Sequence, residues 1–289
     1  MIANRPSGGA RPRHAALASI AWCLLALTAA CDTTSREAAA FTSAGVTHLQ
    51  QREYDRAIRD FDRALAIQPG LVVAWRQRGL AHIAKGDYDR AIADFDHALG
   101  FAPNDARLLT DRGAAYALIN EYPRALQDFD RAISIRPDQV TALEHRGRTH
   151  FILGNFAQAA ADLQRGLNAA DPDPYAVLWL HLARRRLAQD DSSDFAAHAA
   201  SVDSTRWPAP VTRYFLGGVG ADSLRRLAVA ADTSAKTPEC EVAFYLGADA
   251  LLRGQRDSAR AHFVESRDAC PRDLAEHKAA MAELRRLRR

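Results

Sequence analysis

The feature that most constrains this chain is a sequence period of 34 residues. Between residues 38 and 173 a glycine, an aromatic residue, an alanine, a large apolar residue and a second small residue return in register over four copies, and a proline closes each copy. A fixed period of this length is typical of stacked supersecondary units, each too small to bury its own apolar face. The recurring residues are Gly45, Gly79, Gly113, Gly147; Tyr54, Tyr88, Tyr122, Phe156; Ala57, Ala91, Ala125, Ala159; Phe61, Phe95, Phe129, Leu163; Ala64, Ala98, Ala132, Gly166; and Pro69, Pro103, Pro137, Pro172.

Each copy is expected to form two antiparallel helices. Small residues let the two backbones approach closely, large apolar residues fill the space between neighbouring pairs, and proline ends the second helix because it lacks an N–H. The pattern resembles the tetratricopeptide repeat (TPR), with copies at 38–71, 72–105, 106–139 and 140–173. The resemblance implies an all-α solenoid of helical hairpins that curls into a superhelix with a concave groove.

The rest of the chain is a diverged helical continuation. Helices are expected over 174–187, 195–200, 211–216 and 223–231, within a segment that spans 174–239. A fifth repeat-like hairpin follows at 240–273, where Gly247 and Phe263 keep the internal offsets of the earlier copies. Residues 274–289 predict a helix that caps the stack, with Asp273 and Glu276 as a capping box at its start.

The first 30 residues have the build of an export signal, with a basic beginning, an apolar stretch and small residues before a cysteine. The ending Leu27-Thr28-Ala29-Ala30-Cys31 resembles the lipobox of bacterial lipoproteins, which implies cleavage before Cys31, lipidation of that cysteine and a short linker over 31–37. Leucine stands one position earlier than in the commonest lipobox. A plain secretory signal cut nearby is therefore the alternative.

Removal of this signal leaves 35 basic and 35 acidic residues, so the mature chain is not basic, which argues against nucleic acid as a partner. It also leaves Cys240 and Cys270 as the cysteines besides Cys31. An even number of thiols suits an oxidising compartment. The two lie at opposite ends of the helices of the fifth hairpin, where an antiparallel arrangement brings them together, and a disulfide is predicted.

A narrower resemblance rests on the runs Asp173 to Leu180, Arg213 to Gly217 and Phe244 to Gly247, together with Trp207 and Glu276-His277. These are similar to the NlpI-type envelope lipoproteins. The resemblance implies a lipid-anchored scaffold that faces the bacterial periplasm and can form a homodimer. It also implies that the protein partners of this scaffold are cell-wall hydrolases or a periplasmic protease. A lipoprotein subunit of an outer-membrane or pilus assembly machine is the alternative, and a hydrolase that uses scattered Asp, Glu and His is a third hypothesis from another class.

Enzymatic chemistry is not indicated, because the chain carries no zinc-protease helix, phosphate-binding glycine loop or nucleophile elbow. His48, His82 and His150 recur on the repeat grid, but equivalent positions of neighbouring repeats are too far apart to share a zinc ion. No cofactor or metal site is therefore expected. The arginines at 285, 286, 288 and 289 fit either a solvated helix end or a contact with anionic lipid or an acidic partner.

The partner is expected to bind in the groove, on one face of the first helix of each repeat. An apolar strip flanked by arginine suits an amphipathic helix or an extended segment that carries acidic residues. The alternative is that the strip is occupied by the protein's own terminal helix or by a second copy. The predicted lining residues are Val46, Leu49, Arg76, Leu80, Ile83, Arg107, Leu118, Arg148, Phe151 and Ile152.

Overall fold

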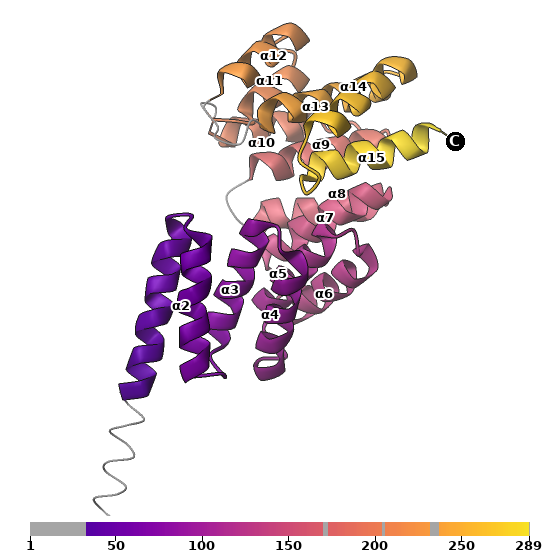
Figure 1. The fold of residues 1–289 in the computed structure, drawn as a ribbon. Helices are drawn as coiled ribbons and strands as arrows, with labels where there is room; N and C mark the ends of the chain where they lie inside the picture. Colours follow the sequence, from indigo (N-terminus) through magenta and orange to yellow (C-terminus); the bar gives the residue numbers. More distant parts are fainter. Residues whose placement is uncertain (1–32, 170–172, 204–205, 232–236, 289) are drawn as a thin grey trace, which may run out of the picture. The chain divides into compact units, whose positions relative to one another are not determined.

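The computed structural model describes residues 33–169, 173–203, 206–231 and 237–288, and the regular secondary structure of these residues is entirely helical (Figure 1). The predicted signal and Cys31 lie outside the described residues. The chain divides into two compact units, residues 1–101 and 102–289, and each is described here by itself. None of the described helices is long and apolar enough to span a bilayer.

The N-terminal unit contains two hairpins. The helix over residues 33–50 pairs with α2 (Tyr54–Ile67), and α3 (Val72–Lys85) pairs with α4 (Tyr88–Phe101). The repeated glycine is explained by contact across each hairpin: a Cβ built on Gly79 would lie 2.7 Å from Cε1 of Phe95, and one on Gly45 would lie 2.6 Å from Cε1 of Phe61. No side chain larger than hydrogen fits there without a shift of the ring.

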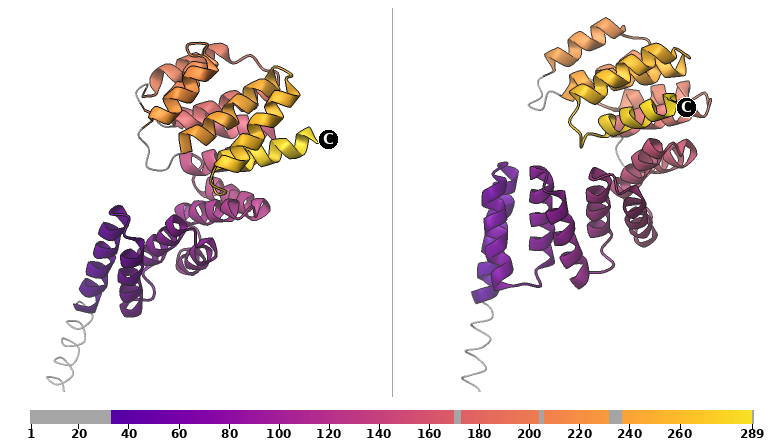
Figure 2. Two further views of the ribbon diagram at one scale, coloured as in Figure 1. Left: turned by 45° about the horizontal axis from the view of Figure 1, so that its top comes forward. Right: turned by 45° about the vertical axis from the view of Figure 1, so that its right-hand side comes forward.

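The second unit begins with two hairpins of the same kind, α5 (Ala106–Leu118) with α6 (Tyr122–Ile135) and α7 (Val140–Leu153) with α8 (Phe156–Ala169). The two further views in Figure 2 show the paired helices of each unit lying side by side. The C-cap of α7 is Gly154, whose φ of +88° is the left-handed conformation that favours glycine after a helix C-terminus. The repeat pattern therefore gives the same hairpin in both units.

The remaining helices of the second unit are α9 (Pro174–Arg186), α10 (Ser192–Ser201), α11 (Ala209–Phe215), α12 (Ala221–Ala230), α13 (Thr237–Leu252), α14 (Arg256–Ala269) and α15 (Ala275–Leu287). Helices α13 and α14 repeat the hairpin geometry, since a Cβ on Gly247 would lie 2.8 Å from Cδ1 of Phe263. The predicted capping box is wrong. Leu274 is the N-cap of α15 without a side-chain hydrogen bond, and Glu276 is buried at 2% exposure.

A ladder of ion pairs also follows the 34-residue period. Arg112 donates from Nε and Nη2 to both carboxylate oxygens of Asp128, at 2.8 and 2.6 Å. Arg78 pairs in the same two-point way with Asp94, and Arg146 with Asp162. All three carboxylates are buried. Each pair joins the two helices of one hairpin. The planar guanidinium matches both oxygens, so the pair fixes the rotation of one helix against the other.

Candidate binding groove

The predicted groove residues of the N-terminal unit lie on the first helix of each hairpin and remain partly accessible. Val46 and Leu49 are half-buried and pack against the small core around Phe61. On α3, Leu80 and Ile83 are half-buried too, as is Arg76. Their neighbour Val73 is 53% exposed. In this unit the structure thus leaves an apolar face, formed by Val46, Leu49, Val73, Leu80 and Ile83, which we call the N-terminal face.

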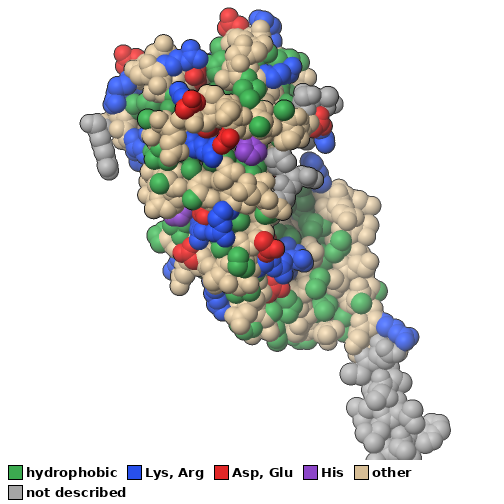
Figure 3. All heavy atoms as spheres, turned by 180° about the vertical axis from the view of Figure 1, so that it is seen from behind, with side chains coloured by type: hydrophobic (Ala, Val, Ile, Leu, Met, Phe, Trp, Pro, Cys, Tyr) green, Lys and Arg blue, Asp and Glu red, His purple; other side chains and the backbone are tan. Residues whose placement is uncertain are grey.

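Seen from behind, this unit occupies the lower right of Figure 3, and the side drawn there carries mainly hydrophobic and uncharged side chains. Charged groups of the unit are instead largely paired with one another. Lys85, at the end of α3, donates to Asp55 at 2.5 Å, and Arg78 donates to Asp62 as well as to Asp94. Apolar contact is the main interaction that the N-terminal face can offer to a partner.

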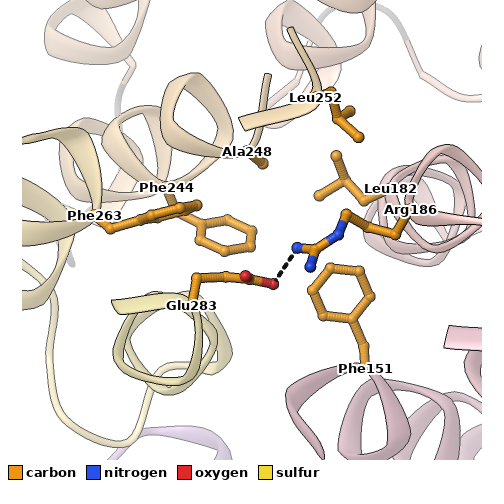
Figure 4. Close-up of a pocket in the computed structure, with 8 residues that line it drawn as sticks. All are labelled: Phe151, Leu182, Arg186, Phe244, Ala248, Leu252, Phe263 and Glu283. Atoms are coloured by element: carbon orange, nitrogen blue, oxygen red, sulfur yellow. Dashed lines mark hydrogen bonds and ion pairs between the residues drawn. The ribbon is translucent and has the colours of Figure 1, made fainter. Parts of the chain in front are cut away.

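In the second unit the same repeat positions are covered by the chain itself. Phe151 is 2% exposed and Ile152 is 7% exposed, and both belong to the core formed with Trp179 of α9 and Phe244 of α13. The prediction that these two side chains face a partner is therefore wrong. Figure 4 shows Phe151 directed toward the buried ion pair of Arg186 and Glu283, at the edge of a cavity of about 10 Å³. That volume has room for about one water molecule.

Helix α15 makes the contact with the ends of the repeats. Lys278 donates from Nζ to the carbonyl oxygen of Leu118 at 2.8 Å and to Oδ1 of Asn120 at 3.1 Å. Near the other end of α15, Arg286 donates to the carbonyl oxygen of Ile152 at 2.5 Å. Leu118 itself is half-buried. In repeats three and four, the protein's own terminal helix thus occupies part of the predicted strip, as the alternative interpretation expected.

The two arginines predicted for this part of the groove differ in their surroundings. Arg107 is exposed at the start of α5. Arg148 is half-buried and donates to Nδ1 of His145 at 3.1 Å. Burial lowers the pKa of His145 to about 3, so its imidazole is neutral and can accept this hydrogen bond. Arg148 thus belongs to the interior contacts of the second unit.

A buried acidic cluster in the second unit was not predicted as such, although four of its residues, Tyr175, Trp207, Tyr245 and Glu276, carry the resemblance to the envelope lipoproteins. Oε2 of Glu241 accepts hydrogen bonds from Trp207 Nε1 at 2.7 Å and from Tyr175 Oη at 3.1 Å, and Glu276 accepts one from Tyr245 Oη at 3.1 Å. Burial, together with the charge of Glu241, raises the pKa of Glu276 to about 7. Burial also raises the pKa of Glu241.

Two of the recurring histidines contact carboxylates of their own repeat. His48 Nδ1 lies 2.7 Å from Oδ2 of Asp60, and His82 is buried beside Asp87 and Asp94. Burial lowers the pKa of His82 and of His150. Among the residues that the structure describes, no group of three or more His, Cys, Asp or Glu side chains could hold a metal ion.

Cys240 and Cys270 form a disulfide with their Cα atoms 5.1 Å apart. Cys240 lies in the first turn of α13, and Cys270 is the C-cap of α14, so the bond closes the open end of this hairpin. Both residues are buried. The hairpin carries α15 directly after it. The disulfide therefore fixes the point from which the terminal helix departs.

These features define a helical-repeat protein built from stacked hairpins. Residues 45–108 and 110–177 each match the tetratricopeptide repeat family. Over these residues the chain consists of tetratricopeptide repeats, a kind of repeat that is generally found in protein-interaction scaffolds.

Solved structures share the fold at low sequence identity. PilF of Pseudomonas aeruginosa superposes with a TM-score of 0.56 at 16% identity, covering 87% of this chain and 99% of that one. PilW, described as a widely conserved type IV pilus biogenesis factor, has a TM-score of 0.54 at 18% identity and covers 80% and 93%. A tetratricopeptide repeat protein of Parabacteroides merdae has a TM-score of 0.55 at 13% identity, with coverage of 85% and 99%. These likenesses establish the fold alone.

Proposed function

We propose that this protein is a non-enzymatic scaffold, anchored by lipid on Cys31 in a bacterial cell envelope and facing the periplasm, which holds a protein partner on its N-terminal face. The observation that carries the proposal is the contrast between equivalent repeat positions. Ile83 is half-buried, whereas its counterpart Phe151 is buried in the core of the second unit. Large apolar side chains left accessible at a repeat position are typical of a binding surface.

The envelope location rests on the sequence of the first 31 residues and on the disulfide. The small residues before Cys31 fit a lipoprotein signal, and a buried disulfide suits an oxidising compartment. The resemblance to NlpI-type lipoproteins remains a prediction, and it makes cell-wall hydrolases or a periplasmic protease the first candidates for the partner. A lipoprotein subunit of an outer-membrane or pilus assembly machine is the second candidate, and PilW, which shares the fold, is described as a type IV pilus biogenesis factor.

A photo-crosslinking residue in place of Val73 tests the partner site in intact cells, with the same residue in place of Val229 as the control. Both valines are exposed, at 53% and 68%, but Val229 lies on α12, far along the chain from the first two repeats. We expect one dominant partner from position 73 and none from position 229. Loss of that product on Leu80→Glu, with unchanged helical content, supports the N-terminal face. Equal products from both positions would refute it.

Replacement of Cys31 by alanine tests the anchor. We expect the variant to remain uncleaved or to leave the membrane fraction, because several acyl chains, each contributing about 0.8 kcal/mol per buried CH₂, are what hold a lipoprotein on a bilayer. A variant that stays membrane-bound and normally processed would show that the lipid anchor is absent.

A further inference from the structure

The repeat grid allows the covered and the open repeats to be compared position by position. The thirteenth residues of the four repeats are Gln50, Ala84, Leu118 and Ile152. Gln50 and Ala84 are exposed, Leu118 is half-buried and Ile152 is buried. Helix α15 therefore covers the ends of the first helices in repeats three and four, and the corresponding ends in repeats one and two stay accessible.

The contacts that α15 makes there are equivalent to one another. Lys278 donates to the carbonyl of Leu118 and Arg286 to the carbonyl of Ile152, which is the same position in consecutive repeats. The carbonyls in the last turn of a helix have no partner within the helix and carry its negative dipole end. One helix thus satisfies two consecutive repeat ends with two cations placed eight residues apart, a rise of about 12 Å along its axis.

The N-terminal unit has backbone carbonyl oxygens at the same repeat position, but no Lys or Arg side chain of the described residues donates to them. Within the described residues, the carbonyl oxygens of Gln50 and Ala84 accept no hydrogen bond, although neighbouring carbonyls such as Leu49 and Ile83 do. The N-terminal face, with Leu49 and Ile83 one residue before these carbonyls, provides the apolar part of the same surface.

We propose, on the basis of the proposed function, that the partner binds repeats one and two through an amphipathic helix that resembles α15. Its apolar face, with small residues for close approach, contacts Leu49, Leu80 and Ile83. Two Lys or Arg residues about two turns apart donate to the carbonyls of Gln50 and Ala84.

The chain's own sequence supplies the probe, because α15 shows which helix fits repeat ends of this kind. A fluorescent peptide with the sequence of residues 274–288 is titrated with the full chain in detergent and followed by anisotropy. A second peptide carries glutamate at the positions of Lys278 and Arg286. We expect saturable binding of the first peptide, at least tenfold weaker binding of the second, and weaker binding of the first at higher salt.

Protein variants locate the binding. Leu80→Glu, and Val73→Glu as the more exposed and milder change, should each weaken the peptide at least tenfold, while Val229→Glu should leave it unchanged. If the charge-reversed peptide binds equally well and Leu80→Glu still weakens its binding, the proposed hydrogen bonds from Lys or Arg are wrong. The N-terminal face would then still be the partner site. If neither Leu80→Glu nor Val73→Glu weakens binding, the peptide has replaced α15 on repeats three and four, and the inference is overturned.

Two further outcomes also decide against it. Failure of both peptides to bind would overturn the α15-type partner, whereas the crosslinking from position 73 judges the partner site independently. Conversion of a dimer of the chain into monomers by Leu80→Glu, measured by sedimentation, would identify a second copy as the occupant in place of a partner.

Discussion

Glu276 gives the sharpest quantitative consequence of the structure. Its carboxyl is 2% exposed in the first turn of α15, with Tyr245 donating to Oε1 at 3.1 Å. Burial and the nearby charge of Glu241 raise its pKa from 4.5 to about 7. We predict that Glu276→Gln, which keeps the shape and the acceptor oxygen but cannot ionise, stabilises the protein above pH 7.

The sign follows from proton linkage. Below about pH 4.5 the carboxyl is protonated in both the folded and the unfolded chain, and it does not affect stability. As the pH rises toward 7, the unfolded chain releases this proton while the folded chain retains it, so the free energy of unfolding falls through that window. A shift of this size corresponds to about 3 kcal/mol, since one pKa unit is worth about 1.4 kcal/mol. Above pH 7 this contribution is constant.

Urea unfolding at pH 5, 6, 7 and 8, followed by circular dichroism, measures the effect. The difference in free energy of unfolding between Glu276→Gln and the wild type should grow with increasing pH, whereas buried histidines such as His145 change the stability of both proteins alike. Glu239→Gln, the same chemical change at an exposed residue of α13, is the control and should track the wild type. The same pH dependence for the wild type and Glu276→Gln, or a Glu276→Gln variant that is less stable than the wild type at pH 8, would refute the reasoning.

Three further predictions concern the repeats and the fifth hairpin. Gly79→Ala should destabilise by about 1–2 kcal/mol through overpacking, whereas Gly100→Ala, where a Cβ meets nothing within 4 Å, should stabilise by up to about 1 kcal/mol in thermal unfolding. Asp128→Asn should cost about 2 kcal/mol by weakening a half-buried bidentate pair, and an unchanged melting temperature would exclude a structural role for the ladder. Replacing Cys240 and Cys270 by serine should cost about 3.5 kcal/mol for a loop of 30 residues, and non-reducing peptide mapping with both thiols free would contradict the bond.

The sequence was sufficient to predict what depends on the 34-residue period. The all-α hairpin architecture is confirmed, and the close approach at Gly45 and Gly79 accounts for the conserved spacing within the chain. The ion-pair ladder follows the same period and could have been read from it, because Arg78, Arg112 and Arg146 recur 34 residues apart. Properties that repeat in sequence repeat in structure, since each hairpin packs against its neighbour in the same way.

Contacts between distant segments could not be predicted in this way. Glu276 has the spacing of a capping box from Asp273, yet it is buried against Tyr245, which is 31 residues away. A local sequence pattern does not show which helix will pack over Glu276. Burial against α13 contributes more free energy than a side-chain cap would. Phe151 was assigned to the groove for the same reason, because its repeat position faces outward until another part of the chain covers it.

The repeat sequences nevertheless differ between the repeats that α15 covers and those that it leaves accessible. The thirteenth residue is Gln50 and Ala84 in the first two repeats and Leu118 and Ile152 in the third and fourth, so a large apolar side chain stands at this position where α15 makes its contacts. Burial of a large apolar side chain is favourable because it leaves water. Gln50 and Ala84 are suited to repeat ends that alternate between a bound and an unbound state, because an exposed large apolar residue there would promote aggregation whenever the partner is absent. The same position thus distinguishes a permanent intramolecular contact from the reversible one that we propose.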